Sequence, residues 1–447
     1  LGPGDERALT RGAWDTLCLA EEIYLRTRHH PTVEHLPADL TLHTFDELYE
    51  QHDSFADVYD AIAREVVRLG SRPQGVIYGV PGHPLVGESS VQRILALAPA
   101  AGLAVRLIGG LSFVEAALES LGIDALDGIQ IADGTQIAQS HHPWLNPDLP
   151  ALIAQVYNRV VASDVKLALM NLYHDDHPVV LVQGADGPVP SRRKIKLYEL
   201  DWQDDLDHLT TLYVPPVERR SSTAAFQDVI ARLRAPGGCP WDREQTHQSL
   251  QGNLLEETYE VLAAIDADDP VELCEELGDL LLQIVLHAQI ATEEATFKAV
   301  DVLQGITAKM ERRHPHVFGD AQADDSDTVL RNWEQIKRAE RGDPHRSLFE
   351  GIPAGLPALA QAMALQRRAA RVGFDWDAPE PVLAKVAEEV GEVQQADDPA
   401  SRLDEFGDLL FSLVNVARWM EIDPETALRR ANQRFATRFQ HIEQTAA

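Results

Sequence analysis

Acidic residues in the C-terminal half fall in pairs whose spacing suits a metal site. Glu257 and Glu260 stand three residues apart, and so do Glu276 and Asp279. Residues three apart on a helix project from one face, so two helices joined by a short loop can aim four carboxylates into one space. Carboxylate oxygens are the ligands that hard divalent cations prefer, and Mg²⁺ is the usual cation beside phosphates. The spacing therefore predicts a site where metal ions bind phosphate oxygens and activate a water molecule.

The same acidic pattern occurs twice along the chain. Two short blocks in the first copy have counterparts of matching order and nearly equal spacing in the second. The matched segments are 256–261 with 388–393, and 276–281 with 405–410. The second copy thus offers the acids Glu389, Glu392, Glu405 and Asp408. Agreement in order and spacing predicts an internal duplication.

The second acidic segment of each copy predicts carboxylates on a buried helix. Around Leu280–Leu286 the pattern is apolar on nearly all sides, and the polar residues share one narrow stripe. The stripe of the first copy is Glu276, Asp279, Gln283 and His287, and that of the second is Glu405, Asp408, Ser412 and Asn415. A helix that is apolar on most sides is buried, and buried carboxylates are costly unless they are paired or bind a metal. A solvated helix face is the alternative, and the apolar surroundings favour the metal site.

Basic residues beside the acids suit a phosphate substrate. The chain has only seven lysines, and Lys309, Lys337 and Lys385 lie near the acidic pattern. Lys309 is followed by Arg312 and Arg313, and its counterpart in the second copy is Arg430 with Arg434 close behind. Lysine binds phosphate as a point charge and arginine as a two-pronged donor. Ordinary ion pairs on helix surfaces are the alternative for each residue taken singly.

Composition and charge exclude several classes of protein. The chain has 447 residues, enough for two to four domains, and a formal net charge of −32 that would repel nucleic acid and anionic lipid. We see no apolar run long enough to span a membrane and no signal peptide. Cys18, Cys239 and Cys274 are isolated in sequence, which fits a reducing cytoplasm. We therefore expect a cytoplasmic protein that binds neither nucleic acid nor membrane.

The pattern of elements changes along the chain. Residues 1–216 alternate β-rich runs with helical patterns, which predicts an α/β domain with buried strands at 75–80, 104–108 and 178–182 and a helix at 113–121. Residues 214–222 lose all periodicity and read as a linker. The remainder shows helical periodicity only and is predicted to be all-α. The expected helices cover 223–233, 254–266, 271–291, 300–313, 328–341, 359–371, 383–396, 403–420 and 424–444.

The helical half resembles the MazG family of nucleotide pyrophosphohydrolases. The resemblance rests on the two acidic blocks and on the runs Gly238–Thr246, Arg312–Phe318 and Trp333–Lys337. It implies two all-α repeats, at 224–345 and 358–447, and a homodimer whose helices build the sites together. It also implies hydrolysis of nucleoside triphosphates to monophosphate and pyrophosphate with Mg²⁺, or with Mn²⁺ as the alternative ion.

The resemblance assigns roles to individual residues. The metal ligands would be Glu257, Glu260, Glu276 and Asp279, then Glu389, Glu392, Glu405 and Asp408. Glu256 and Glu388 would act beside Glu257 and Glu389 in catalysis by orienting the water. The nucleotide would contact Trp241, Lys309, Arg312, Arg313, Trp333, Lys337, Trp376, Lys385, Arg430, Asn432 and Arg434. The second copy shows no counterpart of the segment with Trp333 and Lys337, so the sequence leaves open which site turns over.

Glycine-rich turns mark the ends of expected strands in the N-terminal half. Ligands of open α/β sheets bind at such strand ends. The residues concerned are Gly4, Asp5, Pro81, Gly82, His83 and Ser112. Together they resemble the tetrapyrrole (corrin/porphyrin) methylase family, which implies that S-adenosylmethionine binds across these loops. A domain that regulates or dimerises is the alternative to an active methyltransferase.

Three functions therefore follow from the sequence as alternatives. The first is a nucleoside triphosphate pyrophosphohydrolase that cleans nucleotide pools, and the residues favour it. The second is an S-adenosylmethionine-dependent methyltransferase with an accessory helical domain. The third is a scaffold that senses nucleotides without turnover. The preferred base and sugar are not written in the sequence.

Overall fold

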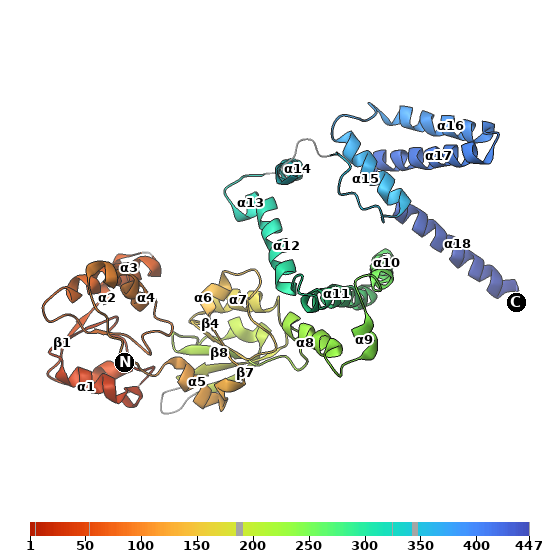
Figure 1. Cartoon of the computed structure of the whole chain (residues 1–447). Coiled ribbons are helices and arrows are strands. Elements are labelled where there is room, and N and C mark those ends of the chain that lie inside the picture. Colours follow the sequence, from red (N-terminus) through yellow and green to blue (C-terminus); the bar gives the residue numbers. More distant parts are fainter. Residues whose placement is uncertain (5, 53, 185–190, 324, 342–346, 447) are drawn as a thin grey trace. The chain divides into compact units, whose positions relative to one another are not determined.

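The computed structural model describes residues 1–4, 6–52, 54–184, 191–323, 325–341 and 347–446 (Figure 1). These residues form two compact units, Leu1–Ala299 and Val300–Ala447. The division falls inside the range 224–345 that the sequence assigns to a first repeat. Helix α12 (Ala299–Arg313), which begins at this division, has no buried residue in the described structure. The domain ranges drawn from the sequence therefore stay predictions.

The first unit begins with a parallel sheet in the order β2-β1-β3. Its strands are β1 (Glu22–Leu25), β2 (Thr41–Thr44) and β3 (Tyr78–Gly79). The helices around it are α1 (Arg11–Leu19), α2 (Asp46–Gln51), α3 (Phe55–Gly70) and α4 (Ser89–Leu97). Ser54 begins α3 because its hydroxyl accepts a hydrogen bond from the Asp57 amide, and α3 buries its apolar side, including Ile62 and Val66. The parallel strands place all their carboxyl ends at one edge.

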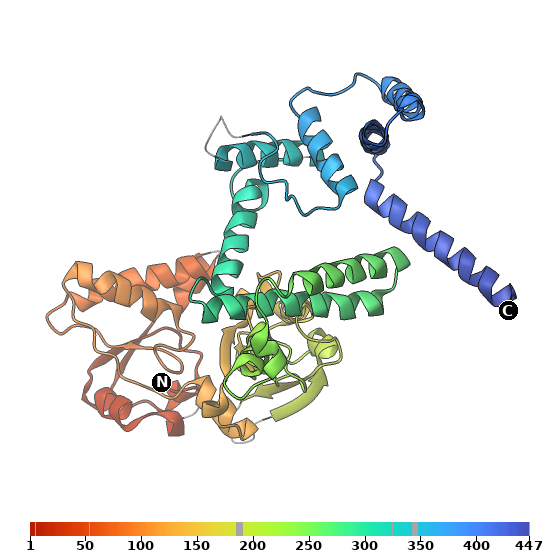
Figure 2. The same ribbon diagram turned by 45° about the vertical axis from the view of Figure 1, so that its right-hand side comes forward.

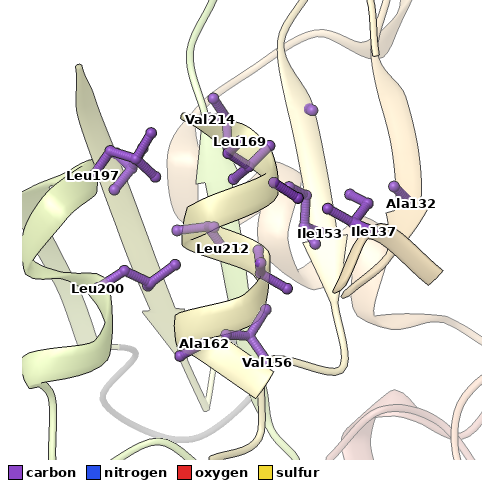
Figure 3. Close-up of a cluster of buried hydrophobic side chains, with 14 of the residues drawn as sticks. Ala132, Ile137, Ile153, Val156, Ala162, Leu169, Leu197, Leu200, Leu212 and Val214 are labelled. Atoms are coloured by element: carbon purple, nitrogen blue, oxygen red, sulfur yellow. The ribbon is translucent and has the colours of Figure 1, made fainter. Parts of the chain in front are cut away.

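A second, mixed sheet follows in the order β4-β5-β8-β6-β7. Its strands are β4 (Gln130–Asp133), β5 (Ala151–Ala154), β6 (Pro178–Gln183), β7 (Ser191–Lys196) and β8 (Thr210–Val214). Helix α5 (Phe113–Leu121) precedes β4, and α6 (Gly134–Ala138) and α7 (Arg159–Leu169) lie between the strands. Figure 3 shows the core of this sheet, where Ile153 and Leu212 from the strands meet Leu169 of α7. These three side chains are fully buried, so the predicted α/β fold is confirmed.

One predicted strand is wrong. Residues 104–108 form neither strand nor helix, and Val105 and Leu107 are exposed. The run has the apolar composition of a strand, but a strand also needs a hydrogen-bonded neighbour, and no ladder reaches it. The run expected at 75–80 pairs with β1 mainly at Tyr78 and Gly79, whereas the run at 178–182 is confirmed as β6.

A linker joins this α/β region to the helices of the same unit. The Asp148 carboxylate accepts hydrogen bonds from the amides of Ser221 and Ser222, and from the Ser222 hydroxyl. Ser222 also caps α8 (Thr223–Arg234) through the Ala225 amide. The helices that follow are α9 (Pro240–Glu244), α10 (Gln251–Ala267) and α11 (Pro270–Glu293). Hydrogen bonds to Asp148 thus hold the end of the linker in place, although the linker sequence has no periodicity.

Helices α10 and α11 form a packed pair (Figure 2). The chain reverses at Asp268, which adopts a left-handed backbone (φ 54°), and Asp269 then caps α11. The Asp269 carboxylate accepts from the amides of Val271 and Glu272, and Pro270 occupies the first turn, where its missing N–H costs nothing. The same Asp-Pro start recurs at Asp398, before the second helix of another pair.

The second unit is helical. It contains most of α12, then α13 (Pro315–Phe318), α14 (Ser326–Arg341), α15 (Ala358–Ala370), α16 (Pro379–Gln395), α17 (Pro399–Trp419) and α18 (Pro424–Ala446). Helix α16 lies beside α17, and α15 packs on α17 (Figure 1). The helices expected from periodicity are confirmed, with ends within a few residues of those predicted. Within the described residues, no helix is both long and apolar enough to cross a bilayer.

Candidate metal and nucleotide site

The first acidic site joins residues from α10 and α11. Carboxylate oxygens of Glu257, Glu260 and Glu276 all lie within 4.8 Å of one another. Burial raises the pKa of Glu257, and the negative charges of Asp279 and Glu260 raise it further. The pKa of Glu276 is likewise raised, first by desolvation and then by Glu260. The pair of helices thus gathers negative charge that is unfavourable without a cation.

The second acidic site has the same form on α16 and α17. Oxygens of Glu389, Glu392 and Glu405 lie within 4.8 Å of one another. Glu389 is buried, with 4 % of its surface exposed, and its Oε2 has no hydrogen-bond partner. Desolvation raises the pKa of Glu392; the charge of Lys385 opposes that rise and the charge of Glu389 adds to it.

A lysine distinguishes the two sites. The Lys385 Nζ lies 2.8 Å from Glu388 Oε1 and 2.8 Å from Glu389 Oε1. The corresponding position of the first site, four residues before Glu257, is Asn253. The second site therefore carries a built-in counter-charge where the first has a neutral amide.

Both groups of acids fit a divalent cation. Ligand oxygens about 2.1 Å from a Mg²⁺ ion stand roughly 3 to 4 Å from one another. Three carboxylates within 4.8 Å can reach that arrangement with small side-chain rotations. The repulsion that raises the pKa of Glu257 would be relieved by the ion, and the unpaired Oε2 of Glu389 offers it a buried ligand atom.

Two predicted ligands lie outside these groups. Asp279 and Asp408 are exposed, and neither belongs to the cluster of its own helix pair. Asp279 still acts on the site, because its charge raises the pKa of Glu257. Glu256 and Glu388, the predicted catalytic helpers, are also exposed. Each site therefore brings three of its four predicted ligands together.

The prediction of buried acidic stripes is largely wrong. Among the carboxylates of the two stripes, Asp279 and Asp408 are exposed and Glu276 and Glu405 are only half-buried, whereas Gln283 is buried. Several apolar residues of α11 are themselves exposed, with Leu277 49 %, Leu281 44 % and Ile284 49 % exposed, whereas Leu286 is buried. The periodicity shows which sides of the helix are apolar, but in this chain other residues pack against only some of those sides.

The predicted phosphate-binding arginines are already paired. Arg312 Nε donates to Glu340 Oε1 at 2.7 Å, and Arg313 donates to Glu340 Oε2 at 2.6 Å. These two arginines lower the pKa of Glu340 to about 2, so its carboxylate is ionised throughout the neutral range. Glu340 belongs to α14 and was not predicted, because its partners lie 27 and 28 residues away. A carboxylate offers arginine the same paired oxygens as a phosphate.

Replacing Glu340 by Gln is expected to lower the KM for a nucleoside triphosphate several-fold with little change in kcat. The substitution removes a competitor for the Arg312 and Arg313 donors, whose ion pairs with Glu340 involve partly exposed side chains. Steady-state kinetics with the full chain measure the effect, and Glu311→Gln, an exposed acid on α12, is the matched control. An unchanged KM would mean that these arginines serve only to join α12 to α14.

The other predicted nucleotide contacts are accessible. Lys337 Nζ lies 4.9 Å from the centre of the Trp333 ring, which is half-buried. The remaining residues are exposed at the surface of their helices or loops; they are Trp241, Lys309, Trp376, Arg430, Asn432 and Arg434. Trp241 belongs to the first unit and the others to the second.

The predicted cofactor loops of the N-terminal region do converge. The Gly82 amide donates to the Gly2 carbonyl at 2.7 Å, and a Cβ on Gly110 would stand only 3.0 Å from the Gly82 carbonyl. Gly82 has a left-handed backbone (φ 67°), which favours glycine at this turn after β3. Burial opposes the shift, but hydrogen bonds from Ser112 and, to a smaller extent, the nearby His83 lower the pKa of Glu115.

The remaining cofactor residues have structural partners or lie outside the description. Ser112 is buried and caps α5, where its hydroxyl and amide both donate to Glu115. The carbonyl of Gly4 accepts from the Thr32 hydroxyl at 2.8 Å. Asp5 lies outside the described residues.

Comparisons with known proteins identify both parts of the chain. Residues 245–318 match the MazG nucleotide pyrophosphohydrolase domain, and residues 1–188 match the tetrapyrrole (corrin/porphyrin) methylases. The first match contains the first acidic site.

Several curated relatives are similar over long stretches. The protein YabN of Bacillus subtilis is 43 % identical over 460 residues, which cover all of this chain and 92 % of that protein. The nucleoside triphosphate pyrophosphohydrolase/pyrophosphatase MazG of Thermotoga maritima is 46 % identical over 48 % of this chain and 83 % of its own length. The nucleoside triphosphate pyrophosphohydrolase of Escherichia coli K12 is 48 % identical over 49 % of this chain and 86 % of its own length. The chain therefore belongs to the MazG family, in the form that carries a tetrapyrrole methylase domain at its N-terminal side.

Proposed function

We propose that the protein is a Mg²⁺-dependent nucleoside triphosphate pyrophosphohydrolase that releases pyrophosphate and a nucleoside monophosphate. One observation carries the proposal: carboxylates of Glu257, Glu260 and Glu276 gather on one helix pair. The names of the relatives from Thermotoga maritima and Escherichia coli support it, because both state this activity. Keeping noncanonical or damaged nucleotides out of the cytoplasmic pool is the role we propose for it.

The acidic residues of the first site would have different roles. Glu257, Glu260 and Glu276 would hold the cation, with Asp279 completing its ligands after a side-chain rotation. A bound divalent ion would neutralise negative charge on the phosphate oxygens and lower the pKa of an attacking water. Glu256 stands next to Glu257 on the exposed side of α10, where its carboxylate can orient that water and accept a proton from it.

Within the second unit, basic and aromatic residues offer contacts for a nucleotide. Arg312 and Arg313 present paired donors to phosphate oxygens once Glu340 is displaced, and Lys309 adds an exposed positive charge. The accessible part of the Trp333 ring offers a surface for stacking a base. Stacking tolerates every base, which fits a broad substrate range.

The first of the two acidic sites is the one we expect to turn over. Lys385 already neutralises part of the second site, whereas no cation is paired with the first among the described residues. The MazG match also covers the first site. The second site, with its permanent counter-charge, would bind a metal ion more weakly and serve nucleotide binding or structure.

A second copy of the chain is the partner that we propose for the exposed face of α11. Leu277, Leu281 and Ile284 expose close to half of their surfaces, and soluble proteins rarely leave such groups uncovered. Burial of this face against its equivalent would make a homodimer through the helical domain. Light scattering on the full chain tests it: twice the chain mass is expected, and Ile284→Glu should reduce the mass to that of a monomer.

Binding of S-adenosylmethionine is the second function we consider. The approach of Gly82 to Gly2 and Gly110 favours it, because these backbones form a narrow cradle without side chains. Calorimetry with S-adenosylhomocysteine tests the idea on the full chain. Absence of heat at high ligand concentration would leave the domain with a regulatory or dimerising role.

The proposed hydrolase is tested by pyrophosphate release. We expect Mg²⁺-dependent release from a panel of ribonucleoside and deoxyribonucleoside triphosphates, with the preferred base and sugar given by kcat/KM. Binding of nucleotide and metal without any turnover on the whole panel would instead support a nucleotide-sensing scaffold.

A further inference from the structure

Two histidines meet where the turn before α10 lies against α11. His247 belongs to the turn between α9 and α10, and His287 belongs to α11, 40 residues further along the chain. Their Nδ1 atoms lie 2.8 Å apart, and their rings stack with centres 5.1 Å apart and planes 7° from parallel. Leu250, in the same turn, is fully buried in a core cluster with Leu286 of α11. A polar contact and an apolar one therefore hold this turn on α11.

The polar contact needs one donor and one acceptor. An imidazole Nδ1 that carries a hydrogen donates, and an Nδ1 with a free lone pair accepts, but neither does both. Two neutral rings satisfy this requirement, and so does one neutral ring beside one imidazolium. Two imidazolium rings do not, because both Nδ1 atoms then carry a hydrogen and face each other. The hydrogen bond thus tolerates one added proton and is broken by the second.

A neighbouring carboxylate sets the order in which the rings take up protons. Glu294 Oε2 lies 3.7 Å from Nε2 of His247 and favours a positive charge on that ring. Burial lowers the pKa of His287, and the charge of His247 lowers it further. His287 therefore takes up its proton last, and this proton goes to the Nδ1 that accepts the hydrogen bond.

Other charged side chains lie on the segments around the pair; they include Arg232, Arg234, Asp242, Arg243, Glu244, Glu256 and Glu293. Arg234 of α8 pairs with Glu293 of α11 at 2.8 Å, so these two charges offset each other. Asp242 is half-buried, and the remaining four residues are exposed to water. Burial and His247 are the causes of the shift at His287, so the charge that opposes the second proton comes from the pair itself.

We propose that His247 and His287 form a proton-sensitive contact, which holds the turn before α10 on α11 at neutral pH and releases it in acid. Release takes up one proton from solvent, on Nδ1 of His287, and two stacked imidazolium rings then repel each other. The contact contributes fully above the ordinary histidine pKa of about 6.5, and its contribution is lost as pH falls towards the lowered pKa of His287. The contact stands independently of the proposed hydrolase.

Hydrogen–deuterium exchange of the full chain at a series of pH values tests the contact. Peptides covering 244–254 report it, because the amides of Leu250 and Gln251 are hydrogen-bonded within this turn. Each rate is divided by the intrinsic exchange rate at the same pH, which gives a protection factor. We expect constant protection above about pH 6.5 and a fall of up to about tenfold per pH unit below it, because opening binds one proton. Constant protection down to about pH 5.5 would overturn the proposal without any variant.

Asparagine variants separate this contact from other titrating groups. The carboxamide of His287→Asn offers a donor and an acceptor near the position of Nδ1 and cannot take up a proton. It should keep neutral-pH protection within a few-fold of the parent and lose the acid decline. His247→Asn should do the same from the other side of the contact, and it tests the proposal if His287→Asn does not fold. His287→Leu, which removes the hydrogen bond, should show low protection at every pH.

His174→Asn is the matched control, since His174 is an exposed histidine of the same unit. It should show the acid decline of the parent chain. An equal decline in the parent and in the asparagine variants at His247 and His287 would assign the pH dependence to other groups and overturn the proposal.

Discussion

Replacing Glu257 by Gln is expected to lower kcat/KM for nucleoside triphosphate hydrolysis by roughly a thousandfold, because loss of a metal-bound carboxylate removes several kcal/mol of transition-state stabilisation. The side chain keeps its size and loses only its charge. Removal of a charge from a group with a raised pKa should leave the fold intact or slightly more stable. Steady-state release of pyrophosphate by the purified full chain measures the effect.

Two further variants make this result interpretable. Glu389→Gln acts at the second site and is expected to retain most of the activity, because Lys385 already offsets the Glu389 charge. Glu275→Gln changes an exposed acid on α11 beside Glu276 and should behave as the parent chain. Loss of activity in Glu389→Gln with full activity in Glu257→Gln would reverse the assignment of the working site. Full activity in the double variant Glu257→Gln/Glu389→Gln would contradict the assignment of both carboxylate sites to catalysis.

Removal of divalent cations is expected to abolish hydrolysis completely, and addition of Mg²⁺ should restore it. The ion should also stabilise the folded chain, by about 2.7 kcal/mol when its free concentration is a hundred times its Kd. Thermal unfolding with and without Mg²⁺ measures this second effect. In the double variant Glu257→Gln/Glu276→Gln the stabilisation should fall to that given by the second site.

Without metal, the stability of the folded chain is expected to depend on pH through the acids of the first site. The folded-state pKa of Glu257 is raised, so the folded chain binds this proton more tightly than the unfolded chain. The contribution of Glu257 to stability is therefore largest below its usual pKa and falls as pH rises through the raised pKa. Mg²⁺ should flatten this decline, because it takes over the role of the proton. An identical pH profile with and without Mg²⁺ would exclude the cation from the site.

The acidic sites were predictable because their geometry is local. Three-residue spacing places Glu257 and Glu260 on one side of α10, and a short reversal at Asp268 brings Glu276 opposite them. The same logic gives the ion pair of Lys385 with Glu388 and Glu389, at spacings of three and four residues. The starts of two helices carried a local signal that the predicted ranges missed, because Asp269 and Asp398 cap helices that begin at Pro270 and Pro399, before the predicted starts at 271 and 403.

Contacts between distant segments were not predictable from the sequence. Nothing near Arg313 indicates that Glu340 neutralises it, and the two lie on different helices. The run at 104–108 has the composition of a strand but lacks a neighbouring strand. The exposure of Leu281 depends on what packs against α11, which the helix pattern cannot specify.

The products of hydrolysis test the central claim most directly. A deoxynucleoside triphosphate is incubated with the full chain and Mg²⁺, and the products are followed by ³¹P NMR. The carboxylate sites predict pyrophosphate and nucleoside monophosphate in equal amounts, with no signal from nucleoside diphosphate. Orthophosphate and nucleoside diphosphate, or an unchanged triphosphate spectrum at every nucleotide tried, would contradict the assignment of this chain as a pyrophosphohydrolase.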